Sequence, residues 1–354
     1  MSHPPRPDLL TTPEVATVVP RSGAVGRLLP RLGLGLVLAV VVLSALVLFA
    51  ETRDLGAALR GFDWWLAPPA LALTLWNYGL RFLKWQFYLG RIGVRGMRWP
   101  TSLVVFLSAF SMSVTPGKVG EVIKAVHLRR LAGTPVSQTT AVIAAERITD
   151  GLAMLLLASA GAVQFAFGCG LLAAVSAVAG VALLLLRRPG RLRALVERLP
   201  ALPVIGRPAA HADAFLGVTG SLLAPRPLAT ATAFGAVAWL GECGALFLVL
   251  VGLDQQPSFR LFLVAMFVLA VSTLAGAVSL VPGGLGVAEA SVAGMLLALL
   301  ADDGITRGTA AAATLLIRFG TLWFAVLLGI VALALVRRLG PDATAAARPE
   351  GGER

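Results

Sequence analysis

Long apolar runs alternate along the chain with short polar segments that are mostly basic. The main runs cover residues 32–50, 64–89, 100–114, 137–186, 228–253, 261–280 and 308–336. A helix of about 20 apolar residues crosses the ~30 Å hydrocarbon core of a bilayer, so most of these runs are long enough to span and 137–186 is long enough for two spans. The pattern predicts an all-α polytopic membrane protein. Residues 32–50 are interpreted as the first span; a signal peptide is the alternative, but the run starts late and ends in Ala-Glu-Thr-Arg, a poor cleavage site.

Composition agrees with this pattern and narrows the function classes. The chain has 354 residues, 57% of them hydrophobic and 14% charged, with a formal net charge of +12. The basic residues flank apolar runs and form no patch between aromatic side chains, which argues against nucleic-acid binding. The two cysteines and three histidines show no metal-ligand or nucleophile spacing. We therefore predict no catalytic residue, no metal site and no cofactor.

Two apolar regions contain the same Pro-Gly interruption. Residues 113–120 read Ser-Val-Thr-Pro-Gly-Lys-Val-Gly and are followed by Glu121, while residues 279–286 read Ser-Leu-Val-Pro-Gly-Gly-Leu-Gly and are followed by Glu289. A broken helix inside a membrane leaves backbone groups that need partners, so such a break is costly. Two breaks with the same residue pattern therefore indicate a duplicated unit. We expect Thr115 and Pro116 to begin the first half-helix, and the free N–H groups after each break to suit an anion.

Loop charges predict how the chain crosses the membrane. The halves on each side of a break are short for a span, so each break is interpreted as a re-entrant helical hairpin; a single kinked span is the alternative at the first. The positive-inside rule places the basic loops and both termini in the cytosol, and the loops at 51–63, 254–260 and 302–307 outside. The result is about six full spans and two hairpins, arranged as inverted repeats over residues 64–166 and 228–336, which is typical of secondary transporters.

Three segments are predicted to lie outside the bilayer core. Residues 1–31 and 339–354 are interpreted as disordered cytosolic tails on either side of a transmembrane domain at 32–338. Residues 187–227 contain seven arginines and two acidic residues, and we expect an amphipathic helix on an anionic cytosolic leaflet.

Ionisable and glycine residues near the breaks form the candidate site. Charged groups in apolar runs are costly, so we expect them to be paired or to face water. Arg81, Lys84 and Lys124 also fit side chains that reach to the interface, and Glu146, Arg147 and Asp150 fit an internal ion pair as well as a substrate contact. The predicted substrate-binding residues are Arg81, Thr115, Gly117, Lys118, Gly120, Glu121, Glu146, Arg147, Asp150, Gly283, Gly284, Gly286, Glu289 and Arg318.

These motifs, in this order, resemble the flippase-like family, also called the lysylphosphatidylglycerol synthase transmembrane-region family. The residues that carry the resemblance are Asn77 to Arg81 with Trp85, Thr115 to Glu121, Glu146 and Arg147 with Asp150, Pro282 to Gly286 with Glu289, and Arg318. The resemblance covers about residues 32–338 and implies an integral inner-membrane protein. In the fused synthases this region is associated with moving the modified lipid between leaflets. The chain lacks their soluble aminoacyl-transferase domain, so lysyl transfer is not carried over, and Lys118 stands where arginine is as frequent.

The sequence therefore predicts a bacterial inner-membrane protein that moves an anionic lipid or lipid-linked precursor between leaflets. Its expected partners are membrane lipids with anionic head groups, not nucleic acid; a second copy or lipid-pathway enzymes are the candidate protein partners. Two alternatives stay open: a membrane-embedded enzyme of lipid or glycan assembly, and a non-transporting scaffold in a lipid pathway.

Overall fold

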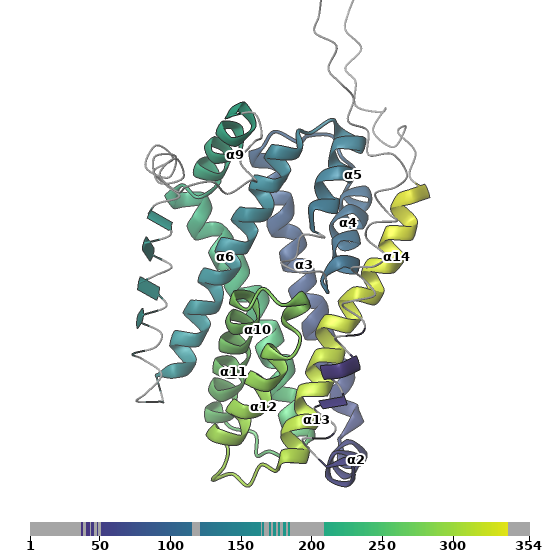
Figure 1. The fold of residues 1–354 in the computed structure, drawn as a ribbon, viewed down its shortest axis with the longest axis vertical. Helices are drawn as coiled ribbons and strands as arrows, with labels where there is room; N and C mark the ends of the chain where they lie inside the picture. The colour runs from purple at the N-terminus through teal and green to yellow at the C-terminus, as the bar shows by residue number, and fades with distance from the viewer. Residues whose placement is uncertain are drawn as a thin grey trace, which may run out of the picture.

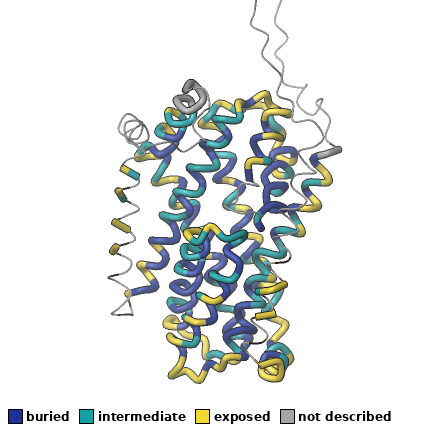
Figure 2. Tube along the Cα trace, in the orientation of Figure 1, coloured by how far each residue is buried: buried dark blue, intermediate teal, exposed yellow. Residues whose placement is uncertain are grey.

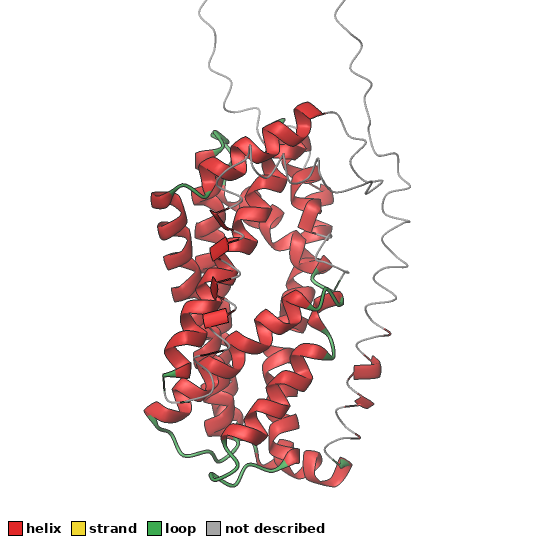
Figure 3. Cartoon of the chain, turned by 60° about the vertical axis from the view of Figure 1, so that its left-hand side comes forward, coloured by secondary structure: helices red, strands yellow, loops and turns green. Residues whose placement is uncertain are grey.

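The fold is a bundle of helices, as the apolar runs predict. A computed structural model describes residues 51–114, 121–163, 165 and 209–338, with single residues between 37 and 48 and between 170 and 184. Within these residues every regular element is a helix and no strand occurs (Figure 3). The two predicted tails, residues 115–120 and most of the first run lie outside the described part.

The helices follow the predicted order (Figure 1). In chain order the α-helices are α2 (Thr52–Gly61), α3 (Ala67–Arg91), α4 (Trp99–Ser108), α5 (Ile123–Ala132), α6 (Val136–Ala162), α9 (Ala209–Leu222), α10 (Pro225–Gly252), α11 (Phe259–Val278), α12 (Val287–Leu299), α13 (Arg307–Arg318) and α14 (Phe324–Arg338). Short 3₁₀ turns η1 (Trp64–Leu66), η2 (Ala109–Met112) and η4 (Pro282–Gly284) and a π turn η5 (Phe319–Trp323) connect or interrupt them.

Membrane character is evident from helix length and composition. Four described segments are long and apolar enough to cross a bilayer: Pro225–Gly252, Phe259–Val278, Pro282–Leu299 and Arg307–Val336. Helices α3 and α6 have 25 and 27 residues, long enough to cross ~30 Å at ~1.5 Å per residue, but they carry several buried charges. Different helices lie at the two ends of the bundle. In Figure 1, α5, α9 and the end of α14 lie at the upper end, and α2 and α13 lie at the lower end.

The second Pro-Gly break joins two antiparallel helices. In Figure 1, α11 rises from the lower end of the molecule to its middle, and α12 returns to the same end. Arg260 at the start of α11 donates to the Asp303 carboxylate at 2.5 Å and to the Leu299 carbonyl at 3.2 Å, which ties the two ends together. At the break itself Gly283, Gly284 and Gly286 all have positive φ, a conformation that favours glycine.

The described residues just before the first break lie against the second break. Helix α4 and turn η2 descend from the upper end, and α5 returns to it (Figure 1). The chain before residue 115 reaches the second break, since a Cβ placed on Gly283 would meet the Ser113 carbonyl oxygen and the Val114 Cα at 3.5 Å each. Two interrupted helices from opposite ends therefore meet inside the bundle.

Several helix contacts join the first half of the chain to the second. Helix α3 packs against α10, α4 packs against α14, and α11 packs against α6. Two contacts are close at a glycine: Gly329 of α14 lies on the Ser111 backbone in turn η2, which follows α4, and Gly161 of α6 lies on the backbone of Phe267 in α11. Small residues at crossings let membrane helices approach closely.

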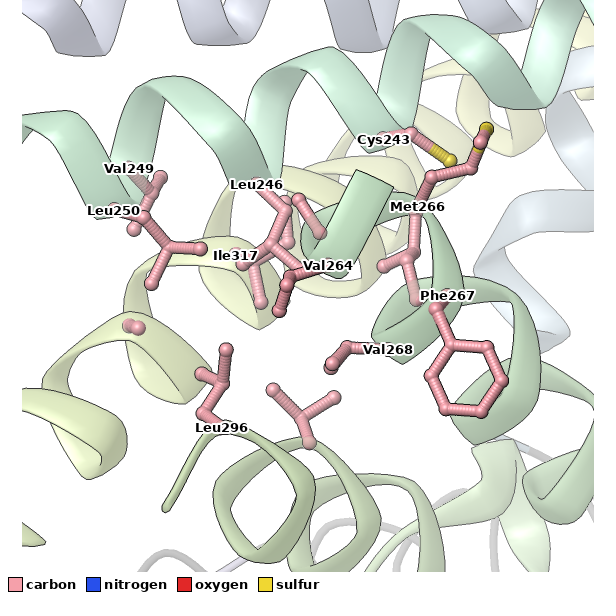
Figure 4. Packing of buried hydrophobic residues seen from close by; sticks show 14 of the residues in the cluster. Cys243, Leu246, Val249, Leu250, Val264, Met266, Phe267, Val268, Leu296 and Ile317 are labelled. Carbon is pink, nitrogen blue, oxygen red and sulfur yellow. The ribbon is translucent and has the colours of Figure 1, made fainter. Parts of the chain in front are cut away.

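The apolar core lies mainly in the half of the bundle that holds the second break. Figure 2 shows the buried stretches of these helices, and Figure 4 shows Leu246, Val264, Val268, Leu296 and Ile317 converging from α10, α11, α12 and α13. A second cluster around Trp85, Tyr88 and Phe106 joins α3, α4 and α6. The buried charged residues are Lys84, Glu121, Lys124, Glu146, Asp150, Glu242 and Glu289.

The basic segment differs in part from the prediction. Its described portion is α9, which contains no arginine and packs against α6, with Leu222 and Leu223 buried at its end. Residue Arg226 belongs to α10, and the other six arginines of 187–227 lie outside the described residues. Contact of those arginines with a lipid leaflet stays a prediction.

Candidate functional site

A cavity of about 140 Å³ lies where the two breaks meet. Its wall comes from almost every long helix: Tyr78 and Arg81 of α3, Trp239 and Glu242 of α10, Thr273 and Gly276 of α11, and Arg318 and Thr321 after the second break. Glu121, Ser113, Gly283 and Gly284 add the ends of both breaks. Polar groups from both halves thus face one space inside an apolar bundle.

Arg318 and Glu289 bind each other and the backbone of the second break. The Arg318 Nε donates to Glu289 Oε1 at 2.6 Å, and its Nη2 donates to the Gly283 carbonyl at 3.0 Å. The other carboxylate oxygen of Glu289 accepts the Gly286 N–H at 2.7 Å, so the side chain caps its own helix. The π turn that follows Arg318 is a feature frequent at functional sites; the Tyr78 hydroxyl donates to its Thr321 carbonyl at 2.6 Å.

This network changes the expectation for the second half-helix. Helix α12 begins at Val287, several residues after Pro282, and the intervening Pro282–Gly284 is a 3₁₀ turn. The Gly286 N–H, predicted to meet an external anion, is bound by the Glu289 carboxylate instead. The anion at this helix N-terminus is therefore supplied by the protein.

Asp150 is the centre of the charge cluster in the other half. It is 5% exposed and receives a hydrogen bond from Lys84, while Arg147 Nη2 lies 3.4 Å and Arg81 Nη2 3.9 Å from its Oδ2. Arg147 also pairs with Glu121, with 3.4 Å between Nε and Oε2. The five side chains joined by these contacts carry three positive and two negative charges.

Arg81 has the least constrained guanidinium of this cluster. Its Nη2 lies at the long distance of 3.9 Å from Asp150 Oδ2. Its Cζ lies 5.6 Å from the ring centre of Phe110 and 5.4 Å from that of Trp239. Two aromatic faces hold the cation by electrostatic attraction while leaving its N–H groups to point elsewhere.

Lys124 and Glu146 form a separate and balanced pair. Their Nζ and Oε2 atoms are 2.9 Å apart, and each side chain is 3% exposed. The ammonium also lies 4.8 Å from the Trp85 ring and 5.0 Å from the Phe106 ring. Neither residue lines the cavity, so this pair joins α5 to α6 as a structural contact.

The prediction that Arg81, Lys84 and Lys124 reach to the membrane interface is wrong. Lys84 and Lys124 are 1% and 2% exposed and bind carboxylates of α6 inside the bundle. Arg81 points to the cavity rather than to the surface. Buried charge of this kind persists in membrane helices when it is paired or faces a polar space.

A second cavity, of about 270 Å³, adjoins the first. Glu121, Arg147, Asp150 and Gly151 line it together with apolar residues of α6 and of the end of α11. The two cavities share several wall residues, namely Glu121, Trp239, Thr273, Gly276, Ala277 and Gly284. We call the 140 Å³ space the inner cavity and the 270 Å³ space the outer cavity.

The structure brings most of the predicted site residues together. Arg81, Glu121, Gly283, Gly284 and Arg318 line the inner cavity, and Glu121, Arg147 and Asp150 the outer one. Glu289 and Gly286 stand behind Arg318, whereas Glu146 lies apart with Lys124. The predicted residues Thr115, Gly117, Lys118 and Gly120 lie outside the described part.

Sequence reasoning missed several residues of the site. Tyr78, Trp239 and Glu242 line the inner cavity, and Lys84 binds Asp150 behind it. The acid Glu242 inside an apolar run was the one available signal, since a lone carboxylate there is costly. Within the described residues no cluster of three or more His, Cys, Asp or Glu side chains could hold a metal ion.

Known proteins match the region of the chain that contains the two cavities. The sequence pattern of the family described as "Lysylphosphatidylglycerol synthase TM region" matches residues 34–329. A protein of Methanothermobacter thermautotrophicus described as "UPF0104 membrane protein" is 25% identical over 312 residues, or 83% of this chain and 90% of the relative. The matched region contains every residue of both cavities.

Proposed function

Since the chain belongs to the lysylphosphatidylglycerol synthase TM region family and is an integral membrane protein, we propose that it moves an anionic lipid or lipid-linked precursor between leaflets. One observation carries the proposal: a cavity lined by Arg81 and Arg318 at the meeting point of two broken helices. A charged cavity is costly in a bilayer, and ionisable groups there usually mark a substrate path.

The symmetry of the helix contacts supports a transporter architecture. Exchange of the two halves converts the α4–α14 contact into the α11–α6 contact, and the α3–α10 contact into itself. Inverted repeats with broken helices meeting near the midplane are the arrangement that alternating access uses. We extend the proposal to this arrangement, with α4–α5 and α11–α12 as re-entrant hairpins from opposite sides.

The chemistry of the cavity favours a phosphate-bearing head group. Arg81 offers a planar set of N–H donors between two aromatic rings, and guanidinium groups bind phosphate oxygens in pairs. Arg318 is already bound to Glu289 and Gly283, so Arg81 is the primary contact and Arg318 supports the opposite wall.

Leaflet exchange of fluorescent phosphatidylglycerol in proteoliposomes tests the proposal. We expect Arg81→Gln to abolish most of the protein-dependent exchange, and Arg81→Lys to recover little because an ammonium lacks the planar donor set. The matched control is Arg260→Gln, which removes an arginine from an exposed ion pair at the end of the bundle. Wild-type protein that exchanges no lipid, or Arg81→Gln protein that exchanges it normally, would contradict the proposal.

We further propose the bacterial inner membrane as the location, with both termini in the cytosol. The experiment uses single cysteines at position 302 or 95 after Cys169 and Cys243 are replaced by alanine. A membrane-impermeant maleimide added to intact cells should label Asp302→Cys and leave Arg95→Cys unlabelled. The opposite labelling pattern would reverse the orientation, and labelling of both positions would exclude the inverted repeat.

A further inference from the structure

The outer cavity has a polar end and an apolar end. Its polar end holds Glu121, Arg147 and Asp150, which belong to the ion-paired cluster. Its apolar end is formed by Ile143 and Met154 of α6 and by Leu274, Leu280 and Val281 at the end of α11. This division matches an amphipathic molecule better than a water-soluble one, because a small polar solute would leave the apolar wall unused.

The apolar end opens at the outer surface of the bundle. Leu280 is 71% exposed and Val278 is 81% exposed. Both lie at the end of α11, which reaches the middle of the molecule's height in Figure 1. Leu280 has a φ of 56°, which is uncommon for a residue with a side chain. We expect these exposed apolar side chains to face the hydrocarbon of the bilayer.

One part of the outer cavity's wall has open space beside it. Gly151 lies on α6 between the polar and apolar ends, and a Cβ placed on it would meet nothing within 4 Å. In contrast, Gly161 of the same helix is packed on the backbone of α11. Open space therefore lies beside α6 at Gly151, whereas the same helix touches α11 at Gly161.

We propose that the outer cavity is a lateral portal through which one anionic phospholipid enters from the bilayer. The head group lies at Arg147, and the acyl chains pass between α6 and Leu280 and stay in the hydrocarbon. This inference deepens the proposed function and rests on it. Arg147 is the cation that lines the outer cavity, and Lys84 and Arg81 lie against the same Asp150 carboxylate that it contacts.

The inner cavity is the next position of the head group. The wall that the two cavities share includes Glu121 and Trp239, and Trp239 also stacks on Arg81. A phosphate that leaves Arg147 meets Arg81 on the other side of this wall, and Glu242 is a further carboxylate there. The portal therefore leads to the site where the two breaks meet.

A photo-cross-linker tests the portal without requiring transport. The full chain carries p-benzoylphenylalanine in place of Leu280, in vesicles of equal parts phosphatidylglycerol and phosphatidylcholine. The control places it at Leu327, which is 63% exposed on α14 and lines neither cavity. We expect the ratio of phosphatidylglycerol to phosphatidylcholine adducts to be several-fold higher at 280 than at 327. Equal ratios, or adducts to another part of the chain or to a second copy, would overturn the portal.

A larger side chain at Gly151 provides the second test. Gly151→Leu should lower the adduct ratio at 280 to the control level and reduce lipid exchange several-fold, with unchanged thermal stability. The matched control is Gly294→Leu, at an exposed helical glycine of α12 that also has open space at its Cβ. Normal exchange in Gly151→Leu combined with lost exchange in Arg81→Gln would refute the portal and keep the proposed function. A high adduct ratio at 280 with no wild-type exchange would keep the portal and refute transport.

Discussion

The two helix breaks share a sequence pattern but hold charge in different ways. At the second break, one arginine and one glutamate satisfy each other and the surrounding backbone. At the first break, the cluster around Asp150 keeps three cations for two carboxylates and faces both cavities. The two breaks therefore differ: Arg318 and Glu289 bind each other at the second, whereas three cations share two carboxylates beside the first. We therefore expect the first break to bind the anion and the second to stabilise the fold.

The largest effect is expected at Asp150. The substitution Asp150→Asn keeps the side-chain volume but leaves Lys84, Arg147 and Arg81 around a neutral group. Removing one partner of a buried ion pair costs about 3–5 kcal/mol, so we expect a large drop in thermal stability in detergent. Added phosphatidylglycerol should restore part of that stability, because its phosphate supplies negative charge. The control is Asp302→Asn in an exposed loop, which should change neither quantity.

The sequence predicted the positions of the helices closely because apolar runs and Pro-Gly breaks mark them directly. The run at 64–89 became α3 (Ala67–Arg91), and the break at Pro282 became a 3₁₀ turn flanked by α11 and α12. Part of the site was also predictable from the sequence, because Glu121, Glu289 and Arg318 are ionisable residues in apolar surroundings.

The pairing of charges could not be read from the sequence. Lys84 and Asp150 are 66 residues apart, and their contact depends on which faces of α3 and α6 meet. Apolar runs in membrane helices are hydrophobic on every side, so they do not indicate the facing side. For the same reason the contact of Trp239 of α10 with Arg81 could not be predicted.

A smaller effect is expected at the second break. Glu289→Gln removes the charge that binds Arg318 and should lower the free energy of unfolding by about 1.5–3 kcal/mol, the value of a hydrogen bond to a charged group. Arg318→Met should have a similar effect, and the double variant should cost less than the sum by ~0.5–3 kcal/mol because the two side chains share one interaction. Additive losses would show that the pair does not act as a unit.

The effect of added phosphatidylglycerol on thermal stability distinguishes the two breaks. If the second break is closed within itself, added phosphatidylglycerol should stabilise the Glu289→Gln variant no more than wild-type protein. A response as strong as that of Asp150→Asn would show that both breaks bind the anion and would remove the distinction between them.

The smallest net effect is expected when the Lys124–Glu146 pair is replaced as a whole. The pair is balanced and lines neither cavity, and Lys124 rests on Trp85 and Phe106. Replacing both residues by methionine exchanges a buried ion pair for apolar contacts, which is often neutral or stabilising by about 1–4 kcal/mol. Either single replacement should cost about 3–5 kcal/mol, because it leaves one charge buried without its partner. Thermal unfolding of the three variants measures this. Lipid exchange by the double variant should equal that of the wild type; a loss of exchange at preserved stability would place this pair in the lipid path with Asp150.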